Sequence, residues 1–443
     1  MSSERNTAAE FWTDGFPAPA SDGRSTLFRG LAHGYLGGVS VLERLLRALR
    51  KPVAPAADAR RGLRIMAVGP FFSENWVAAH LEALARCDLV DRVSVVTPKP
   101  FRDMSGLEYV VFPPKLAARF GDGGARAITA FRTARRERPD LIIGYHLPWN
   151  GLMSLLIARA CGCRVLYFSV GGPAEFLGGG CYSEHALFRR IGRESPALQR
   201  RFVRLLRRFD GVLTMGTRSR DLFESLRLGV PVDPISVGVS AEKFLQREEL
   251  APTGDDAEER YDLVTVGRLA HIKRVDLLIR AVAALADDLR PRVAVVGDGG
   301  ETGELKALAR KLGVDDRIHF LGWREDVEQI LRRSRCFVMS SASEGLPLAL
   351  IEAMLTGLPA IVPDVGDIPD LVEHGVSGFL FEPGDAAGLE TAIRQVLNPG
   401  SGANDMSAEA RRHAERYTVA ARAEDWHRLF APGQGQGQPT NAG

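Results

Sequence analysis

Residues 336–355 read CFVMSSASEGLPLALIEAML, and this stretch carries the pattern from which the fold can be worked out. A short apolar run ends at Met339, a loop of small residues follows, and Pro347 stands where the first turn of a helix tolerates proline. The pattern predicts a buried strand, a tight loop and a helix that continues through Leu355. Such a unit directs free backbone N–H groups and the positive end of the helix toward one point, which suits an anionic phosphate.

The alternation of apolar strands and amphipathic helices continues on both sides of this stretch. The predicted strands are 64–68, 93–97, 141–145, 164–170, 211–215 and 234–237, followed by 263–266, 293–296, 318–321, 336–339 and 360–362. Strands separated by helices predict βαβ units and mostly parallel sheets. We therefore expect an α/β protein with two Rossmann-like, doubly wound domains. The cleft between them should hold the ligand, because open sheets bind ligands beyond the carboxyl ends of their strands.

Linker composition predicts the domain boundaries. In order along the chain, we expect an N-terminal extension and linker (1–61), an N-terminal Rossmann-like domain (62–245), a C-terminal Rossmann-like domain (246–406), a C-terminal helix (407–431) and a disordered, low-complexity tail (432–443). Within the extension, residues 39–51 have helical periodicity, with Leu42, Leu45 and Leu46 on one face.

The composition is that of a globular protein. Apolar residues make up 45% of the 443 residues and charged residues 25%, which excludes a disordered chain, a collagen-like fibre and a disulfide-rich miniprotein. No run reaches about 18 apolar residues, so no membrane-spanning helix is expected, and the acidic N-terminus is not typical of a secretory signal. Five scattered cysteines favour reduced thiols in a cytoplasm. Cys161 and Cys163 lack a second pair at zinc-site spacing and are interpreted as small buried hydrophobes.

Positive charge is concentrated in the first half of the chain. Residues 1–250 carry 36 Lys and Arg against 25 Asp and Glu, and residues 251–443 carry 21 against 30. The segment Arg189–Arg208 holds eight arginines and one acid, with apolar residues at helical spacing. It could lie on an anionic membrane surface, or it could pack its apolar face into the domain, which we favour. The first interpretation would place the protein peripherally at the inner face of the membrane. Nucleic acid is not expected, since aromatic residues are not interleaved as a stacking platform.

A second phosphate-binding pattern lies in residues 263–274, LVTVGRLAHIKR. Arg268 and Lys273 follow a strand and precede a helix, and two cations at this point suit a diphosphate. The alternative is surface charge, but cations are mildly unfavourable at a helix start, which favours the functional interpretation.

Two carboxylates and a glycine-rich turn complete the candidate site. Glu344 lies in the loop of the first stretch. Glu352 lies about one and a half turns inside the helix, where it could bond neutral hydroxyls or could simply be a solvated surface residue. The turn in residues 293–300, VAVVGDGG, lacks the full glycine spacing of a dinucleotide fingerprint and is weak evidence for a nicotinamide site.

In this order, the motifs resemble the retaining glycosyltransferases of the GT-B fold, the family called glycosyl transferases group 1. The matching segments are Gly267–Leu269 with Lys273, Val296–Gly299, Phe320–Gly322 before Asp326-Val327, Glu344 with Glu352, and Gly375–Phe381 with Pro383. The resemblance is close over about residues 262–395 and extends over 63–240 only by pattern. Two segments depart from the family pattern: 69–75 lacks a Gly-Gly loop, and 366–370 reads GDIPD in place of Gly-Gly-x-Pro-Glu.

The resemblance implies a role for each candidate residue. Arg268 and Lys273 would contact the donor phosphates, Glu344 would face the transferred sugar, and these three would form the catalytic set. Glu352 would bond the ribose of the nucleoside. Further donor contacts would come from Gly267, Gly322, Trp323, Gly345, Leu346 and Leu348, and acceptor-side contacts from His146, Gly171 and Gly172.

We therefore expect a cytoplasmic, sugar-nucleotide-dependent glycosyltransferase that acts with retention of configuration in the biosynthesis of a glycan, a lipid-linked saccharide or another glycoconjugate. No Asp-x-Asp stands at a strand end to hold Mg²⁺ or Mn²⁺, so neither a metal nor a cofactor is expected beyond a UDP-, GDP- or ADP-sugar. The alternatives are a sugar-phosphate synthase with a soluble acceptor, a non-catalytic sugar-nucleotide-binding regulator or partner subunit, and a dehydrogenase. The intact Arg268, Lys273, Glu344 and Glu352 disfavour the non-catalytic protein.

Overall fold

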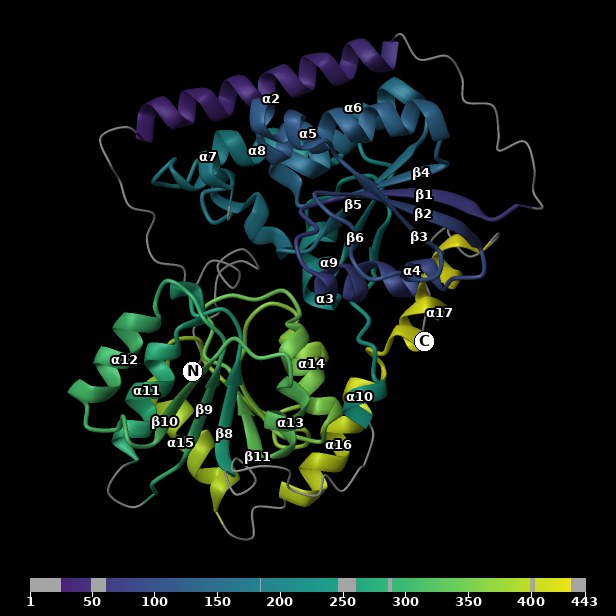
Figure 1. The fold of residues 1–443 in the computed structure, drawn as a ribbon. Coiled ribbons are helices and arrows are strands. Elements are labelled where there is room, and N and C mark those ends of the chain that lie inside the picture. Colours follow the sequence, from purple (N-terminus) through teal and green to yellow (C-terminus); the bar gives the residue numbers. More distant parts are fainter. Residues whose placement is uncertain are drawn as a thin grey trace, which may run out of the picture. The chain divides into compact units, whose positions relative to one another are not determined.

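The computed structural model describes residues 25–48, 61–183, 185–245, 260–285, 289–398 and 403–431. The chain divides into two compact units, each built around one sheet (Figure 1). Among the described residues, the N-terminal unit comprises those up to Gly238 together with 419–431, and the C-terminal unit comprises 239–418. Most of the expected extension and linker, the residues just after the expected boundary at 245, and the expected tail lie outside the described residues.

A parallel sheet of seven strands forms the centre of the N-terminal unit, in the order β3-β2-β1-β4-β5-β6-β7. The strands are β1 (Leu63–Val68), β2 (Val90–Thr97), β3 (Leu107–Val111), β4 (Leu141–Tyr145), β5 (Arg164–Ser169), β6 (Gly211–Thr214) and β7 (Val232–Pro234). Central strands such as β4 and β6 are buried at every position, as expected for a parallel sheet covered on both faces. The edge strand β3 was not predicted, because Glu108 interrupts its short sequence LEYVV and most of its residues are only partly buried or exposed.

Helices cover this sheet and extend the unit at its surface. They are α2 (Ser25–Ala48), α3 (Glu74–Val77), α4 (Ala83–Ala85), α5 (Pro114–Glu137), α6 (Leu152–Cys161), α7 (Ala186–Arg189), α8 (Pro196–Leu206), α9 (Thr217–Ser225) and α17 (Val419–Phe430), with π-helical segments η1 (Ala78–Glu82) and η2 (Leu147–Gly151) and 3₁₀ turns η3 (Gly172–Glu175) and η4 (Leu177–Gly179). The apolar side chains of α8 are buried, so this helix packs into the unit as favoured above. No helix in the described ranges is long and apolar enough to cross a bilayer.

The C-terminal unit contains a six-stranded parallel sheet in the order β10-β9-β8-β11-β12-β13. Its strands are β8 (Tyr261–Val266), β9 (Val293–Val296), β10 (Ile318–Gly322), β11 (Ser334–Val338), β12 (Ala360–Pro363) and β13 (Gly378–Phe381). Its helices are α10 (Glu242–Leu245), α11 (Val275–Ala284), α12 (Thr302–Lys311), α13 (Val327–Arg332), α14 (Leu348–Leu355), α15 (Ala386–Leu397) and α16 (Ala403–Glu415), with 3₁₀ turns η5 (His271–Lys273) and η6 (Ile368–Asp370). All five strands predicted for this half are present.

Both sheets reverse their strand order at one point. In the N-terminal unit the chain order runs outward from the neighbours β1 and β4, and in the C-terminal unit from the neighbours β8 and β11. Such a switch point opens a crevice at the carboxyl ends of the strands, where α/β proteins bind ligands. Arg268 and Glu344 follow β8 and β11, and His146 follows β4. These three candidate residues therefore lie in the loops that leave the two switch points.

The end of the chain differs from the prediction of one helix over 407–431. The structure has two helices, α16 and α17, because the chain leaves helical geometry where Thr418 forms a β-bridge with Val239. Beyond this bridge, α17 belongs to the N-terminal unit and packs against α4 (Figure 1). There Trp426, which is 1% exposed, contacts Phe168 of β5 edge to face.

Candidate functional site

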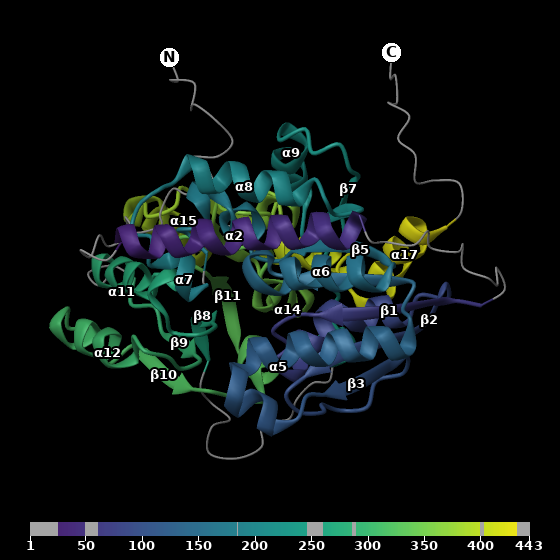
Figure 2. The ribbon, with the colours of Figure 1, turned by 90° about the horizontal axis from the view of Figure 1, so that it is seen from above.

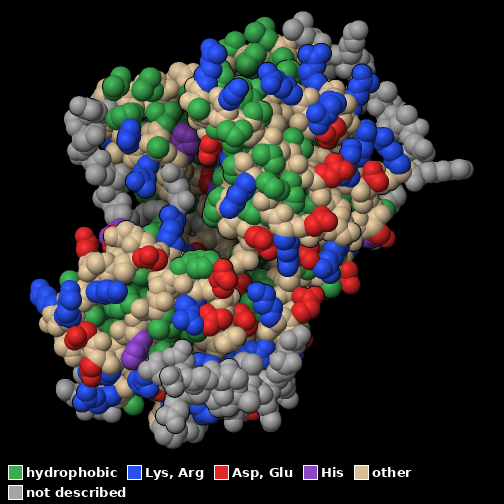
Figure 3. Space-filling model, viewed as in Figure 1, with side chains coloured by type: hydrophobic (Ala, Val, Ile, Leu, Met, Phe, Trp, Pro, Cys, Tyr) green, Lys and Arg blue, Asp and Glu red, His purple; other side chains and the backbone are tan. Residues whose placement is uncertain are grey.

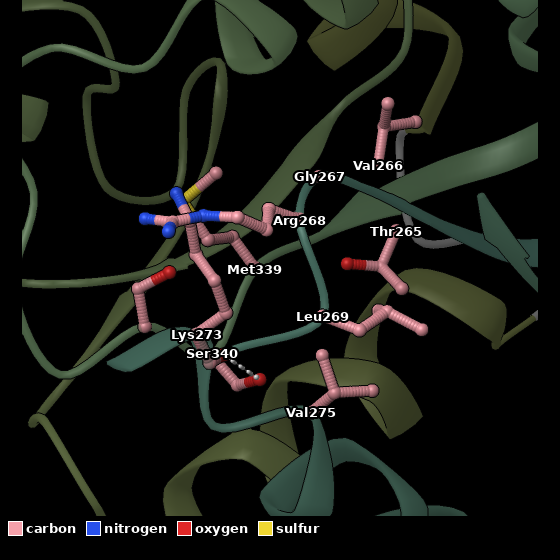
Figure 4. Close-up of a pocket in the computed structure, with 10 residues that line it drawn as sticks. Thr265, Val266, Gly267, Arg268, Leu269, Lys273, Val275, Met339 and Ser340 are labelled. Atoms are coloured by element: carbon pink, nitrogen blue, oxygen red, sulfur yellow. Dashed lines mark hydrogen bonds between the residues drawn. The ribbon is translucent and has the colours of Figure 1, made fainter. Parts of the chain in front are cut away.

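A pocket opens where β8 and β11 end, at the switch point of the C-terminal unit (Figure 4). It is lined by Thr265, Val266, Gly267, Arg268, Leu269, Lys273, Val275, Met339, Ser340 and Ser341. Three of the predicted donor-binding residues, Gly267, Arg268 and Lys273, therefore share one pocket.

Polar contacts fasten the loop after β8 to the loop after β11. The Ser340 hydroxyl donates to the carbonyl of Arg274 at 2.7 Å, and the Ala342 N–H donates to the carbonyl of Ile272 at 2.8 Å. The Lys273 ammonium donates to Oε1 of Glu344 at 2.6 Å. The structure thus brings together two residues that are 71 positions apart and that the sequence placed in one site.

Positive charge reaches this pocket from two side chains. Figure 4 shows Arg268 and Lys273 extending toward the same end of the pocket, near Met339. The Lys273 side chain is 26% exposed and that of its partner Glu344 11% exposed, so the pair is accessible yet largely shielded from water. Two cationic side chains that extend into one pocket suit the negative charge of a diphosphate.

Ser341 is a site residue that the sequence analysis did not single out. It is 1% exposed and lines the pocket, and its hydroxyl has no hydrogen-bond partner among the described residues. A buried hydroxyl without a partner is costly, so its presence here points to a ligand that completes the bond. A serine in a loop of small residues gives no sequence signal of this kind, because burial and an unmet bond appear only in the fold.

The glycine-rich turn after β9 has a packing role. The Gly267 N–H donates to the Val296 carbonyl at 2.9 Å, and the Gly297 N–H donates to the Gly322 carbonyl at 2.7 Å. A Cβ at Gly297 would lie 1.9 Å from the Gly267 carbonyl oxygen, so only glycine permits this approach. The turn therefore holds the ends of β8, β9 and β10 together, which removes the reason for a nicotinamide site. Trp323, next after Gly322, is 71% exposed.

The start of α14 presents unpaired backbone donors, as predicted. Pro347 is the N-cap residue, and no side chain caps the helix. The first N–H groups of a helix have no partner within it. The preceding Gly345 is held by the Asp367 N–H, which donates to the Gly345 carbonyl at 3.1 Å. A Cβ at Gly366 would lie 2.0 Å from the Glu344 carbonyl oxygen. The GDIPD segment, which departs from the family pattern, therefore packs directly against the loop that holds Glu344 and Gly345. Of the predicted contacts on either side of Pro347, Leu346 is buried and Leu348 is partly exposed.

Glu352 lies on α14 and is partly buried. Burial raises the pKa of Glu352 to about 7; the positive charge of Lys243 opposes this shift and the negative charge of Glu328 adds to it. At neutral pH a substantial fraction of this carboxyl is protonated and can both donate and accept hydrogen bonds, which suits neutral hydroxyl groups.

The acceptor-side candidates are organised by Glu175, a second residue that the sequence analysis missed. His146 Nδ1 lies 3.0 Å from Oε1 of Glu175, and the Gly171 N–H donates to the same oxygen at 2.9 Å. The Tyr167 hydroxyl and the Leu147 N–H donate to the other oxygen. Burial alone would raise the pKa of Glu175, but the charge of His146 and these bonds lower it overall, so the carboxylate is ionised. His146 and Gly171 thus share one buried carboxylate, and Gly172 follows directly in the chain.

The His146 ring also packs against an aromatic residue. Trp76 is nearly parallel to His146, with centroids 6.0 Å apart, and stacks on His80 at 4.0 Å. Burial lowers the pKa of His80 to about 3, an effect that its bond to the Trp76 carbonyl opposes and the charge of His146 reinforces. The neutral His80 is therefore a packing partner, whereas His146 remains one-third exposed and adopts φ 65°, an uncommon conformation for a residue other than glycine.

Within the described ranges, one group of three side chains is close enough to share a metal ion: Cys87, Asp88 and His427. It includes none of the predicted site residues.

Comparisons with known proteins assign both units to one kind of enzyme. Residues 246–413 match the family model described as glycosyl transferases group 1, and residues 74–238 match the glycosyl transferase 4-like domain. Together these matches span well over half of the chain.

Individual relatives are more distant. The N-acetyl-alpha-D-glucosaminyl L-malate synthase of Bacillus anthracis is 32% identical over 155 residues, which is 35% of this chain and 41% of that enzyme. The D-inositol 3-phosphate glycosyltransferase of Streptomyces griseus is 34% identical over 163 residues, 34% of each chain. The chain therefore matches less than half the length of these relatives. Anabaena Alr3699/HepE in complex with UDP-glucose is similar in fold, with a TM-score of 0.62 at 21% identity, covering 82% of this chain and 98% of that one.

Proposed function

The chain belongs to the glycosyl transferases group 1 family and has the GT-B fold, and we propose that it moves a sugar from a nucleoside diphosphate sugar to a hydroxyl acceptor with retention of configuration. One observation carries the proposal. The Lys273–Glu344 pair, beside Arg268 and the uncapped start of α14, stands at the switch point of the C-terminal unit. Cations and helix N–H groups at that place favour a diphosphate.

In the proposed reaction, the bond between the anomeric carbon and the β-phosphate oxygen breaks while the acceptor oxygen bonds to the same carbon. Negative charge grows on the leaving phosphate, and Arg268, Lys273 and the first N–H groups of α14 stabilise it. The Ser341 hydroxyl donates one further bond to a phosphate oxygen. The acceptor hydroxyl passes its proton to the departing phosphate, so no separate base is needed, and we propose that no metal takes part.

The remaining candidate residues bind the two ends of the substrates. Glu344 faces the transferred sugar and holds the Lys273 ammonium. Glu352, being readily protonated, bonds the ribose hydroxyls. We propose that Gly322 and Trp323 lie along the base, and that His146, with Gly171 and Gly172, contacts the acceptor side. The relative crystallised with UDP-glucose makes a UDP-sugar the first donor to test. The arginine-rich surface of the N-terminal unit supports a lipid-linked acceptor and a peripheral membrane location.

A thermal-shift screen with UDP-, GDP- and ADP-sugars tests the donor site, because a ligand that binds only the native state raises the melting temperature. We expect one nucleotide class to stabilise the protein, and K273A to lose most of that shift. The exposed Lys311→Ala on α12 is the matched control and should keep it. Release of nucleoside diphosphate from the stabilising donor, with and without EDTA, then separates an enzyme from a binding protein. No shift with any donor would refute the donor site, and inhibition by EDTA would refute the metal-free mechanism.

A further inference from the structure

One face of α2 is locked against the N-terminal unit. Glu43 is 1% exposed and forms ion pairs with Arg159 and Arg208, each at 3.7 Å. The Tyr35 hydroxyl donates to the carbonyl of Pro148 at 2.8 Å. These contacts fix the rotation of the helix about its axis, and therefore decide which side chains point away from the unit.

The opposite face of α2 is apolar, and no other part of the described chain covers it. Leu27, Leu31, Val41, Leu42 and Leu45 are 45–60% exposed, and they recur at helical spacing. We call these five residues the outer face of α2. Side chains added at Gly30, Gly34 and Gly38, which lie between them, would meet no atom within 4 Å beyond the helix itself. The described residues expose eleven large hydrophobic side chains in all, so nearly half of them are gathered on this one helix.

The charge beside this face is positive. Arg44 and Arg47 of α2 are exposed, and Glu43, the one acid among the residues of this helix, is buried. The neighbouring α7 and α8 and the turn between them add exposed arginines at 189, 190, 193, 200, 204 and 207. Figure 2 shows α2 crossing in front of α6 beside α8, and Figure 3 shows hydrophobic and basic side chains together along the edge that α2 forms in Figure 1.

We propose that the outer face of α2 docks this protein on an anionic lipid surface, with the helix lying in the plane of the membrane. The leucines enter the boundary between headgroups and acyl chains, and the arginines contact lipid phosphates. The inference deepens the peripheral membrane location given under the proposed function, on which it rests, by naming the contacting helix, and it does not depend on the donor site. The sequence analysis considered the segment Arg189–Arg208 as the membrane contact. The structure favours α2 in its place, because the apolar residues of α8 are buried and α8 can contribute only its arginines to a membrane contact.

Charge complementarity favours lipid over a protein partner. Apolar side chains on a convex, single helix with cations beside them fit a fluid surface that is apolar inside and anionic at the phosphate level. The 24 residues of α2 give a contact line of about 36 Å. A second copy of the chain, or another protein, remains as an outcome that the experiment distinguishes.

The test is flotation of the full chain with two kinds of vesicle, one of phosphatidylcholine alone and one in which about a third of the lipid is anionic phosphatidylglycerol. Each is measured at low and at high salt. We expect flotation with the anionic vesicles, weakened by salt because the arginines contribute. The double variant Leu31→Glu/Leu45→Glu should lose about tenfold or more in partitioning. The matched control is Val111→Glu/Phe120→Glu, which places the same added charge at exposed hydrophobic positions of the same unit outside the outer face, and it should bind within about twofold of wild type.

Three results would overturn the proposal: no flotation of wild type with anionic vesicles, equal losses in both double variants, or a dimer in light scattering that the α2 variant abolishes while vesicle binding is absent. Circular dichroism and melting temperature of each variant show that it is folded. Nucleotide-induced thermal shifts in the same variants should be unchanged, so failure of membrane binding is distinguishable from failure of the donor site.

Discussion

The ammonium of Lys273 lies 2.6 Å from Oε1 of Glu344 and joins the loops that follow the two central strands of the C-terminal sheet. Because Lys273 is assigned to the leaving phosphate, Lys273→Ala should lower the rate of nucleoside diphosphate release by about 10²–10³-fold, the usual effect of removing one electrostatic stabiliser. Initial rates at saturating donor measure this. Lys311→Ala should retain wild-type rates, and a near-normal rate in Lys273→Ala would disprove the assignment.

Ser341→Ala should change stability and binding in opposite directions. The buried hydroxyl has no partner among the described residues, so its removal should leave the melting temperature of the free protein unchanged or raise it slightly. Donor binding should weaken about 10- to 100-fold, since a bond to a charged phosphate is worth about 1.5–3 kcal/mol. Isothermal titration with the stabilising nucleotide measures the second effect. Unchanged affinity would show that Ser341 does not contact the donor.

The raised pKa of Glu352 makes the stability of the folded protein depend on pH. Its folded-state pKa of about 7 lies above the ordinary value of 4.5, so the native state binds the proton more tightly than the unfolded state. Stability from this group is present below pH 4.5 and is lost as the pH rises to 7, by at most about 3 kcal/mol. Glu352→Gln does not titrate, so its melting temperature relative to wild type should increase between pH 5 and pH 8. Glu304→Gln, exposed on α12, is the control, and parallel pH curves for Glu352→Gln and wild type would contradict the prediction.

His146 allows strain to be separated from function. With φ at 65°, the backbone favours glycine, so His146→Gly should be more stable than His146→Ala by about 1 kcal/mol, although glycine also loses more chain entropy. Both variants lose the ring held by Glu175, and both should lose transferase activity if His146 contacts the acceptor side. Melting temperatures and rates are compared for the two variants. An alanine variant that equals the glycine variant in stability would refute the strain, and full activity in either would refute the contact.

Gly297→Ala should be disruptive where Gly300→Ala is not. The new methyl group would lie 1.9 Å from the Gly267 carbonyl oxygen, whereas at Gly300 it would meet nothing within 4 Å. We expect Gly297→Ala to lose about 3 kcal/mol or more, by overpacking and by its φ of 128°. Thermal unfolding of both variants decides this, and equal melting temperatures would mean that the strand ends can separate at little cost.

The sequence predicted most strands of both sheets, but it missed the edge strand β13 and placed the strand at 234–237 instead of at β7, Val232–Pro234. It placed Lys273 and Glu344 in one site correctly, because residues after parallel strands meet at the same edge of a sheet. The edge strand β3 escaped prediction because it is short and Glu108 interrupts its apolar residues. The start of α2 at Ser25 also escaped prediction, because four glycines interrupt its pattern and weaken the helical signal.

Residues whose importance comes from long-range packing could not be found in this way. Glu175 looks like any acid in a loop until the fold brings His146, Tyr167 and two backbone N–H groups around it. Ser340 donates its hydroxyl to the Arg274 carbonyl, whereas the buried hydroxyl of Ser341 has no hydrogen-bond partner among the described residues. The sequence alone does not distinguish these two serines. Likewise, the periodicity of α2 defines an apolar face, but the buried pairing of Glu43 is what turns that face toward solvent.

The return of α17 to the N-terminal unit has a consequence for biosynthesis. Trp426 fills a position beside Phe168, and His427 Nδ1 lies 2.6 Å from Oδ1 of Asp88, although more than 250 residues separate each pair. The first unit to emerge from the ribosome therefore lacks part of its packing until the entire second unit has been translated.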